Sequence, residues 1–348
     1  MVDLDPDNMP EWLSQLWPKE KLNKEVIAGI NEDDCAILKI KDQLLVITVD
    51  FLNSSPIAKE LGICSFWDLG RLVVASNLSD LCGSGARPIA MLIAVVLERG
   101  AQNEDFQKLM LGVKFELDKY SIPLIGGDTK LGKSTALLGV AIGSGKSERN
   151  LFKKNSAKIG DFIWVSGNIG AASAAVDGLT NIKMDESWND WAKSKLIDPI
   201  LPLEKSQLLS ASGLANGGTD LSDGLGADLL NLCKSSKVGA VIEVDKIPVF
   251  SEVGDLANLR SFPKWSYAFV IGGDFQFLIT APEKASHALE DMGFTKIGYI
   301  TSSDSLFLKL ENDYLLPMPT YGHRDGRRMS FSQEVNYILT ELNKLCTK

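Results

Sequence analysis

Seven aspartates stand at positions where a predicted strand ends or a turn begins, and carboxylates so placed can hold metal ions. They are Asp33, Asp34, Asp50, Asp80, Asp128, Asp220 and Asp223. A single aspartate in a turn is commonplace, because its side chain caps backbone N–H groups. Several carboxylates gathered at the edge of a core repel one another unless cations lie between them. Mg²⁺ held by carboxylate and phosphate oxygens is the usual solution, so the pattern predicts phosphoryl chemistry.

Asp80 lies within the stretch NLSDLCGSGARP, residues 77–88, which is typical of the last turns of a helix followed by a glycine loop. A negative charge near the end of a helix opposes the helix dipole, at a cost of some tenths of a kcal/mol. No Lys or Arg precedes Asp80 within one turn. We therefore expect a positive group from elsewhere, namely magnesium shared with other aspartates.

Asp50 and Asp128 follow apolar strands predicted over 44–49 and 122–125. Each carboxylate should therefore be half-buried at the edge of a core, where it needs a partner. Asp34 and Asp223 have an equal alternative as turn or cap residues, and for Asp274 that role is the preferred interpretation.

Other chemistries are disfavoured by what the sequence lacks. It has no GxxxxGK[ST] motif, and the string GSGKS at 143–147 lacks the first glycine of a P-loop. It also lacks the HRD and DFG motifs of protein kinases. The two histidines, His287 and His323, are too far apart for a local zinc motif. The net charge of −9 argues against nonspecific binding of nucleic acid.

Length and composition predict a cytoplasmic protein of two domains. The 348 residues exceed the size at which a single core usually divides. The longest apolar run, residues 89–97, is too short to span a membrane, and the N-terminus does not resemble a signal peptide. Five scattered cysteines without a CxxC motif indicate reduced thiols. The predicted divisions are an N-terminal helix or tail (1–28), an ATP/Mg-binding and dimerisation domain (29–148) and a C-terminal α/β domain (149–348).

Strands and helices alternate in both halves, which predicts the α/β (α+β) class. Apolar runs predict strands over 44–49, 89–97, 122–125, 136–142, 162–166 and 240–244, and residues 270–280 are expected to form a Gly-rich turn followed by a strand. Helices are expected from a capping box at Ser65–Asp68, over 103–120, and over the small-residue segment 171–179. A further helix should open at Ser222 or Asp223, either of which suits the N-cap.

Seven motifs in order resemble the thiamine-monophosphate kinase family, within the superfamily that includes aminoimidazole-ribonucleotide synthetase. They are EDDCAIL (32–38), TVD (48–50), NLSDLCGSGARP (77–88), IPLIGGDT (122–129), SAKIGDFIWVSG (156–167), TDLSDGL (219–225) and GGDFQFLIT (272–280). The resemblance implies a two-domain fold whose N-terminal mixed sheet pairs across a homodimer, with ATP near the interface, and whose C-terminal domain is an α/β sandwich. It also implies in-line transfer of the ATP γ-phosphoryl group to a substrate phosphate.

The resemblance further implies roles for individual residues. The magnesium ligands would be Asp33, Thr48, Asp50, Asp80, Asp128, Asp220 and Asp223. The contacts to ATP would be Thr48, Gly127, Asp128, Lys154 and Ser222. Lys154 stands where the family has an arginine, which keeps the charge but loses the bidentate fork. The substrate side would include Ile57, Gly273 and Tyr321.

The sequence departs from the family mainly on the substrate side. Residues 53–57 replace a segment whose histidine touches the substrate, and Gly273 replaces a glutamate that faces thiamine. Glu32 and Val49 replace a glycine and a threonine near the metal-binding motifs. The expected acceptor is thus thiamine phosphate or a related small phosphate ester, and the expected partners include a second copy but neither nucleic acid nor a membrane. Two alternatives remain open: an ATP-dependent ligase or cyclase that activates a carbonyl or amide oxygen, and a non-catalytic nucleotide-binding dimer.

Overall fold

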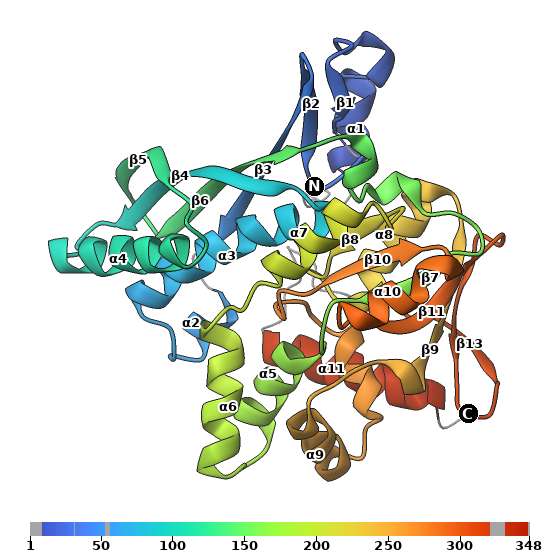
Figure 1. Ribbon diagram of the computed structural model, residues 1–348. Helices are drawn as coiled ribbons and strands as arrows, with labels where there is room; N and C mark the ends of the chain where they lie inside the picture. Colours follow the sequence, from blue (N-terminus) through green and yellow to red (C-terminus); the bar gives the residue numbers. More distant parts are fainter. Residues whose placement is uncertain (1–8, 31, 53–55, 321–330, 347–348) are drawn as a thin grey trace.

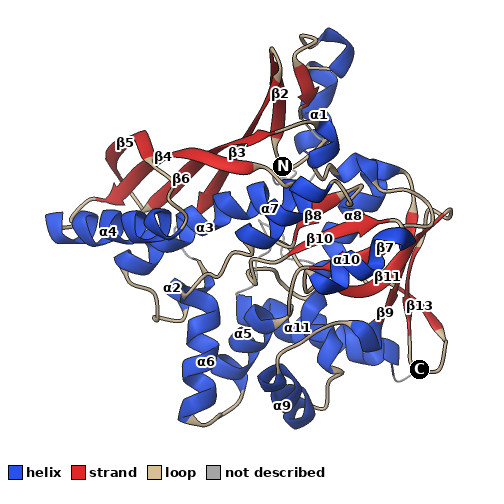
Figure 2. Cartoon of the chain, in the orientation of Figure 1, coloured by secondary structure: helices blue, strands red, loops and turns tan. Residues whose placement is uncertain are grey.

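The computed structural model describes residues 9–30, 32–52, 56–320 and 331–346 of the chain. Its strands form two separate mixed sheets with helices around them (Figure 1). The first sheet is built from strands within 26–145 and the second from strands within 162–317. Figure 2 shows the first sheet at the upper left and the second at the right. The predicted class, α/β with two mixed sheets, is confirmed.

In the described part of the chain, the first sheet has six strands in the order β1-β2-β3-β6-β4-β5, of which only β4 and β5 pair in parallel. These strands are β1 (Val26–Ala28), β2 (Ala36–Ile40), β3 (Gln43–Leu52), β4 (Arg87–Glu98), β5 (Leu124–Gly132) and β6 (Ala136–Gly145). The accompanying helices are α1 (Met9–Leu16), α2 (Ile57–Glu60), α3 (Phe66–Ser84) and α4 (Asn103–Lys119).

Seven strands of the described residues form the second sheet, in the order β13-β12-β9-β11-β7-β10-β8. They are β7 (Phe162–Val165), β8 (Gly218–Asp220), β9 (Gly239–Glu243), β10 (Phe277–Ala281), β11 (Thr295–Thr301), β12 (Leu306–Lys309) and β13 (Leu315–Pro317). The helices are α5 (Ala171–Asn181), α6 (Glu186–Ile197), α7 (Leu203–Ser212), α8 (Leu225–Ser236), α9 (Ser251–Arg260), α10 (Ser286–Asp291) and α11 (Phe331–Cys346).

Helix α3 joins the two halves. It packs against β3 and β6 of the first sheet and against β8 and β10 of the second. The predicted capping box opens it, because the Ser65 hydroxyl accepts from the Asp68 N–H and the Asp68 carboxylate accepts from the Ser65 N–H. Gly70 lets α4 approach closely, since a Cβ there would lie 2.0 Å from the carbonyl oxygen of Leu109. Asp80 lies one turn before the end of α3, as predicted.

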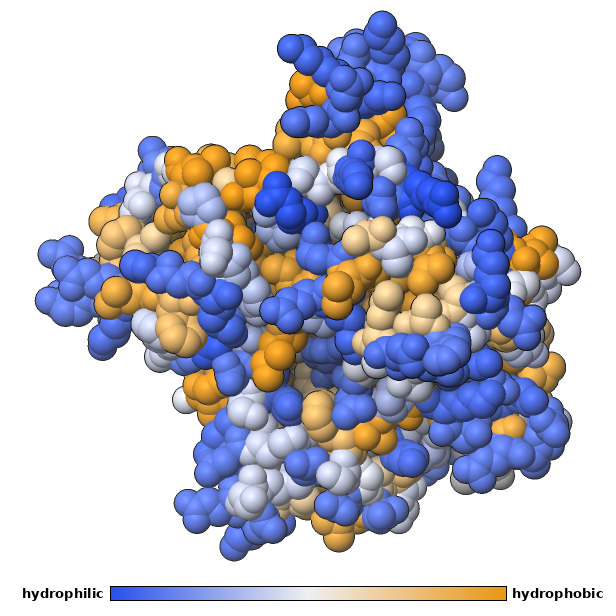
Figure 3. Space-filling model, in the orientation of Figure 1, coloured by the Kyte–Doolittle hydropathy of each residue, from blue (hydrophilic) through white to orange (hydrophobic). Residues whose placement is uncertain are grey.

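One face of the first sheet is covered by α3 and the opposite face is open. Along β3 the residues alternate, so that Val46 and Thr48 are buried while Val49 and Phe51 are more than half exposed. Leu138 of β6 and Leu92 of β4 lie on the same face as Val49 and Phe51 in the sheet register and are partly exposed. Figure 3 shows an apolar area over these strands at the upper left. We call this surface, defined by Val49, Phe51, Leu92 and Leu138, the open sheet face.

Strands β7, β9 and β10 of the second sheet are buried on both faces, and most of their residues are apolar. Trp164 and Phe277 pack in the same core as α3, whereas Ile163 and Leu278, their neighbours in sequence, pack with α5 and α8 on the other side. This is the layered α/β arrangement expected for the second half. Among the described residues, none of the helices is both long and apolar enough to cross a lipid bilayer.

The Gly-rich turn and strand expected over 270–280 are confirmed, with the strand at Phe277–Ala281. Two other local predictions are wrong. The strand expected over 122–125 is β5, which runs on through Gly126–Asp128 to Gly132. The N-cap of α8 is Gly224, with φ of 102°, and no side chain caps this end of the helix. The φ value of Gly224 lies outside the range that Ser222 or Asp223 would need as N-cap, because cap residues with side-chain oxygens adopt extended backbone.

Candidate functional site

The candidate site lies where the end of α3 meets the second sheet. A Cβ at Gly83 would be 2.3 Å from the backbone nitrogen of Asp220, so only glycine allows α3 to contact β8 this closely. The Thr48 hydroxyl of β3 donates a hydrogen bond to the Asp80 carboxylate. The Ser79 hydroxyl donates to the Asp220 carboxylate at 2.9 Å. Strand β3, helix α3 and strand β8 therefore bring Thr48, Asp80 and Asp220 to one place.

A second group of acids approaches from the turn before β2. The Asp33 carboxylate accepts from the Lys154 N–H at 3.0 Å and from the Cys35 N–H at 3.3 Å. Asp34 forms an ion pair with the Lys154 ammonium and accepts from the Thr219 hydroxyl at 3.1 Å. Lys154 therefore places a positive charge at the edge of the carboxylates. Asp34, for which the sequence left a turn role open, is the partner of that charge.

The electrostatics of the cluster point to missing positive charge. Burial, reinforced by Asp34, raises the pKa of Asp33 to about 6 and that of Asp220 to about 7. Burial, together with Asp220 and Asp34, holds the pKa of Asp80 well above its ordinary value. Burial lowers the pKa of Lys154, but the Asp34 carboxylate raises it overall, so the lysine stays charged. One ammonium does not neutralise this set, and a cation that entered would lower all of these pKa values.

Asp228 belongs to the cluster although sequence reasoning missed it. It lies in the first turn of α8, is almost fully buried, and its carboxylate accepts from the Asp223 N–H at 3.1 Å. Burial, followed by Asp223 and Asp220, holds the pKa of Asp228 well above its ordinary value. The signal that could have found it is an acid directly before the apolar pair Leu229–Leu230, four residues into a predicted helix.

Asp50 is half-buried on β3, as predicted. Its N–H donates to the Asn77 side chain at 3.1 Å, and the Asn77 amide donates in turn to the Val73 carbonyl at 2.9 Å. These bonds fix α3 on β3 next to the cluster. The Asp50 charge also contributes to the raised pKa of Asp80, so the two carboxylates are close enough to interact.

Asp128 is placed differently from the prediction. Its side chain is 64% exposed and lies 3.5 Å from Lys130, because β5 continues through it as an edge strand instead of ending at the core. In the sheet register, Asp128 is opposite Ala94, which is opposite Leu138, which is opposite Phe51. Opposed residues share a face, so Asp128 belongs to the open sheet face and Asp50 to the other.

The register also separates these two aspartates along the sheet. The residue of β5 that is in register with Asp50 is Gly127, the neighbour of Asp128. The two are connected across the sheet through Gly139 of β6 and Ile93 of β4. Three strand spacings amount to roughly 14 Å. Within one chain, the structure therefore unites Asp33, Thr48, Asp50, Asp80, Lys154, Asp220 and Asp223, but not Gly127 or Asp128. Ser222 is exposed next to Asp223.

The carboxylates interact through their charges without converging on one point. Within the described residues, no three carboxylate, cysteine or histidine side chains are arranged to hold a metal ion by themselves. Mg²⁺ does not require such a cage, because it usually takes one or two carboxylates and completes its shell with water and phosphate oxygens. The oxygen-only donors and the unneutralised charge fit an Mg²⁺ site that a nucleotide completes.

Two of the predicted substrate residues meet in a small cavity. Ile57 and Gly273 both line it, together with Leu52, Pro56, Ala58, Leu72, Ser76, Ala172, Lys195, Leu196, Gly272 and Phe275. Its volume is about 130 Å³. We call it the acceptor cavity. Tyr321 and residues 53–55 lie outside the described part of the chain.

Asp274 has the structural role that the sequence favoured. Its carboxylate accepts from the N–H groups of Gly170 and Ala172, at 2.5 and 2.8 Å, and so caps the start of α5 from the neighbouring loop. Burial nonetheless raises the pKa of Asp274 to about 6, against the lowering effect of these hydrogen bonds.

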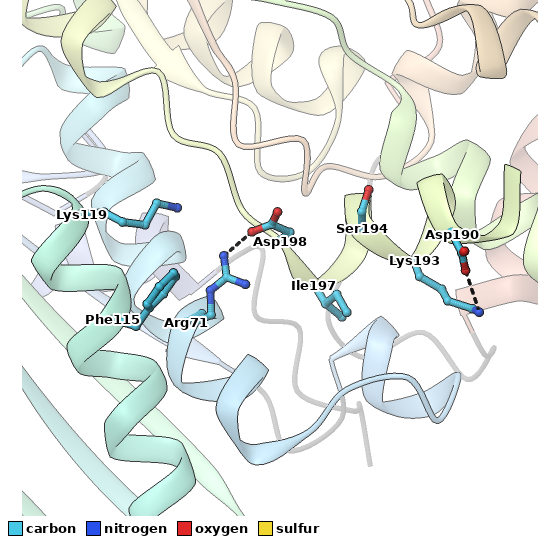
Figure 4. Close-up of a pocket in the computed structure, with 8 residues that line it drawn as sticks. All are labelled: Arg71, Phe115, Lys119, Asp190, Lys193, Ser194, Ile197 and Asp198. Carbon is cyan, nitrogen blue, oxygen red and sulfur yellow. Dashed lines mark hydrogen bonds and ion pairs between the residues drawn. The ribbon is translucent and has the colours of Figure 1, made fainter. Parts of the chain in front are cut away.

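A larger groove of about 520 Å³ lies between α3, α4 and α6 (Figure 4). Its charged residues are paired with one another or with a buried acid. Arg71 contacts Glu116 at 3.0 Å and also pairs with Asp198, while Lys119 contacts Glu116 at 2.8 Å. We conclude that the ion pairs lining this groove have a structural role, because they hold α3 and α4 against the end of α6.

Comparisons with known proteins agree with the two halves of the fold. The family profile of AIR synthase related protein, N-terminal domain, matches residues 32–144, and that of the C-terminal domain matches residues 158–311. The chain is 32% identical to a thiamine-monophosphate kinase of Buchnera aphidicola subsp. Acyrthosiphon pisum over 84% of this chain and 90% of that one.

Solved structures resemble the chain over most of its length. The thiamine-monophosphate kinase of Stenotrophomonas maltophilia is 26% identical with a TM-score of 0.68, and the similarity covers 88% of this chain and 96% of that one. AaThiL complexed with AMPPCP and TMP is 20% identical with a TM-score of 0.79, covering 93% and 98%. At that identity the second likeness concerns the fold alone.

Proposed function

This chain belongs to the thiamine-monophosphate kinase family of the AIR synthase related proteins, and we propose that it transfers the γ-phosphoryl group of ATP to the phosphate of a small ester. Membership of the family makes it an enzyme of the kinase type. The acceptor is thiamine phosphate, giving thiamine diphosphate and ADP, or a related phosphate ester. The AMPPCP and TMP bound to AaThiL support a nucleotide and a phosphate ester as ligands of this fold.

The buried carboxylates carry the proposal. Asp33, Asp80, Asp220 and Asp228 all have raised pKa values, and Lys154 is the cation that pairs with the cluster. Such an arrangement is unfavourable in the protein alone and becomes favourable when cations and a polyphosphate complete it. Bound Mg²⁺ would neutralise the phosphate charge that builds up during transfer.

The protein's own groups would supply position and charge. An oxygen of the acceptor phosphate attacks the γ-phosphorus, the bond from that phosphorus to the β–γ bridging oxygen breaks, and ADP leaves with the electron pair. The Lys154 ammonium would face the transferring phosphate or its neighbour, and the Thr48 hydroxyl, now bound to Asp80, would orient that carboxylate. Asp33, Asp50, Asp80, Asp220 and Asp223 would hold Mg²⁺, and Ser222 would contact the nucleotide.

We also propose that the chain acts as a homodimer through the open sheet face. Val49 and Phe51 there are more than half exposed and Leu92 and Leu138 beside them are partly exposed, and a contiguous apolar surface of this kind marks an interaction site. Asp128 lies on the same face and is separated from the carboxylate cluster of its own chain. Gly127 and Asp128 would therefore serve the site of the second subunit.

Calorimetry with ATP and excess Mg²⁺ tests the proposal directly. We expect ATP to bind with Mg²⁺ and to bind much more weakly when the metal is chelated. Absence of ATP binding would contradict both the kinase and the ligase hypothesis. Turnover with thiamine phosphate and other esters, followed as ADP and product mass, then separates them. Release of inorganic phosphate with a carboxylate or amide substrate, and no phosphorylated product, would favour the ligase or cyclase. Binding without turnover would favour the non-catalytic dimer.

A further inference from the structure

Asp228 is a buried carboxylate to which the phosphoryl transfer described above assigns no role. It lies in the first turn of α8 and is 3% exposed. Its carboxylate accepts from the N–H of Asp223, one of the proposed magnesium ligands, at 3.1 Å. The Asp228 N–H donates to the Gly224 carbonyl at 3.1 Å and so continues the backbone of the helix. Asp228 therefore belongs to α8 through its backbone and to the loop before α8 through its side chain.

The loop between β8 and α8 carries Asp223, and the segment before β10 holds the beginning of this loop. The Leu221 N–H donates to the carbonyl of the residue that precedes β10, at 2.9 Å. Gly272, which also lines the acceptor cavity, packs on Ser222, because a Cβ at Gly272 would lie 2.0 Å from the Ser222 carbonyl oxygen. Asp223 follows and is only half-buried. The hydrogen bond from its N–H to Asp228 ties this residue to α8.

The far end of α8 holds the cation of the cluster. The Ser236 hydroxyl, in the last residue of the helix, donates to the Lys154 carbonyl at 2.7 Å and accepts from the Ala157 N–H at 3.0 Å. The Lys154 ammonium pairs with Asp34. Groups attached to a helix are held more precisely than groups on a free loop. Contacts at its two ends therefore let α8 set the position of Lys154 relative to Asp223.

We propose that Asp228 is a positioning residue, which holds Asp223 where an Mg²⁺–nucleotide complex needs it. This inference rests on the proposed function, because it concerns the metal site of the same phosphoryl transfer. Within the described residues, Asp228 does not complete a set of three side chains that could hold a metal ion. Its effect is exerted through the Asp223 N–H, and groups that fix a metal ligand in this way contribute about tenfold or more to metal affinity.

Two substitutions separate the hydrogen bond of Asp228 from its charge. Asp228→Asn keeps an oxygen that accepts from the Asp223 N–H and removes the charge, whereas Asp228→Ala removes both. Calorimetry with a non-hydrolysable ATP analogue at graded Mg²⁺ concentrations gives the Mg²⁺ concentration at which binding is half-maximal. We expect this concentration to rise about tenfold or more in Asp228→Ala and to stay within about threefold of the wild type in Asp228→Asn.

Asp161→Ala is the matched control for the loss of a buried carboxylate. Asp161 is also 3% exposed, and its carboxylate accepts from the Lys158 N–H at 3.0 Å. It directly precedes β7, and the strand register places it at the end of β7 opposite the cluster. We expect Asp161→Ala to lower the thermal midpoint without changing the Mg²⁺ dependence of nucleotide binding.

The outcomes distinguish the proposal from its competitors. An unchanged Mg²⁺ dependence in Asp228→Ala overturns it and leaves Asp228 a purely structural role. Equal losses in Asp228→Asn and Asp228→Ala also overturn it, because the carboxylate itself would then bind the metal. If Asp228→Ala does not fold, Asp228→Ser takes its place, since the shorter hydroxyl does not reach the Asp223 N–H. A wild-type protein that fails to bind ATP with Mg²⁺ would overturn the proposed function, and this inference with it.

Discussion

The Ser79 hydroxyl donates a hydrogen bond of 2.9 Å to the Asp220 carboxylate, and 141 positions of sequence separate the two residues. Ser79 belongs to the helix that leans on the first sheet, and Asp220 ends a strand of the second. Because Asp80 follows Ser79 directly, this bond fixes the distance between two of the acids to which we assign metal binding. The site is thus a product of the contact between the two halves.

Asp80→Asn should abolish turnover while leaving the fold intact. The amide oxygen can still accept from the Thr48 hydroxyl, but the charge that would hold the metal is lost. We expect at least a hundredfold loss of kcat, on the order of what loss of one electrostatic catalytic group costs. Because ionised Asp80 is surrounded by other acids, the metal-free variant should unfold at the same or a higher temperature. Asp118→Asn, on the exposed face of α4, is the control. Wild-type turnover in Asp80→Asn would contradict shared metal binding.

The metal-free protein should lose stability as the pH rises from about 4 to about 7. The folded pKa values of Asp33 and Asp220, about 6 and about 7, exceed the ordinary value of 3.8. In this window the unfolded chain has released protons that the folded chain still binds, so the free energy of unfolding falls with pH. Urea unfolding across this range, with Mg²⁺ chelated, measures the slope.

Asp220→Asn provides the comparison for that slope. The variant lacks one of the two titrations, so its stability should fall less steeply between pH 5 and 7 than that of the wild type. Added Mg²⁺ and ATP at pH 7.5 should recover the stability of the wild type more than that of the variant. If stability falls equally steeply with pH in the two proteins, Asp220 does not contribute to the pH dependence of folding.

Lys154→Met should weaken both the fold and ATP binding. The substitution leaves Asp34 without its ammonium partner, which should destabilise the fold by up to about 3 kcal/mol. The affinity for ATP with Mg²⁺ should drop about tenfold, because a partly buried charge facing phosphate is removed. Lys154→Arg should retain binding or improve it through a bidentate contact. Calorimetry at a temperature where all three proteins are folded separates binding from stability.

Mixing two inactive variants should restore activity if Asp128 serves the neighbouring subunit. Asp80→Asn and Asp128→Asn homodimers each have two defective sites. Random exchange makes half of the dimers mixed, each with one intact site, so about a quarter of wild-type activity should return. Differently tagged subunits verify that exchange has taken place. Mixed dimers without activity would assign Asp128 to its own subunit.

Phe51→Lys provides the interface control for this experiment. The substitution puts a charge on the open sheet face and should leave a monomer that cannot complement. Leu208→Lys on α7 changes a similarly exposed apolar residue, away from that face, and should remain a dimer. Light scattering measures both. A dimeric Phe51→Lys variant would place the interface elsewhere.

The sequence predicted the fold class and most of the cluster because the relevant patterns are local. Helix α3 could be predicted from the capping box at Ser65–Asp68 and from the glycine loop after Asp80. Strand β4 could be predicted from its apolar run. Asp50 could be placed because it lies on a strand with clear alternation.

The failures arise from contacts that no local pattern contains. Asp128 was expected at a strand end, but the Gly126-Gly127 pair continues β5, since β4 supplies partners through Gly132. Asp228 is a single acid in a helix, and its burial depends on packing against the loop at Asp223. The spacing of residues along the sequence does not reveal which charged side chains from distant segments lie close together in the fold.

The close approach of Gly83 to Asp220 has a consequence for synthesis of the protein on the ribosome. When the first sheet and α3 have emerged, Asp80 exists but strand β8 does not, because Asp220 lies 75 positions after Gly145, the last residue of β6. Under the proposed function, a nascent chain that lacks β8 would not turn over ATP. Activity would begin only when the second half of the chain docks on α3.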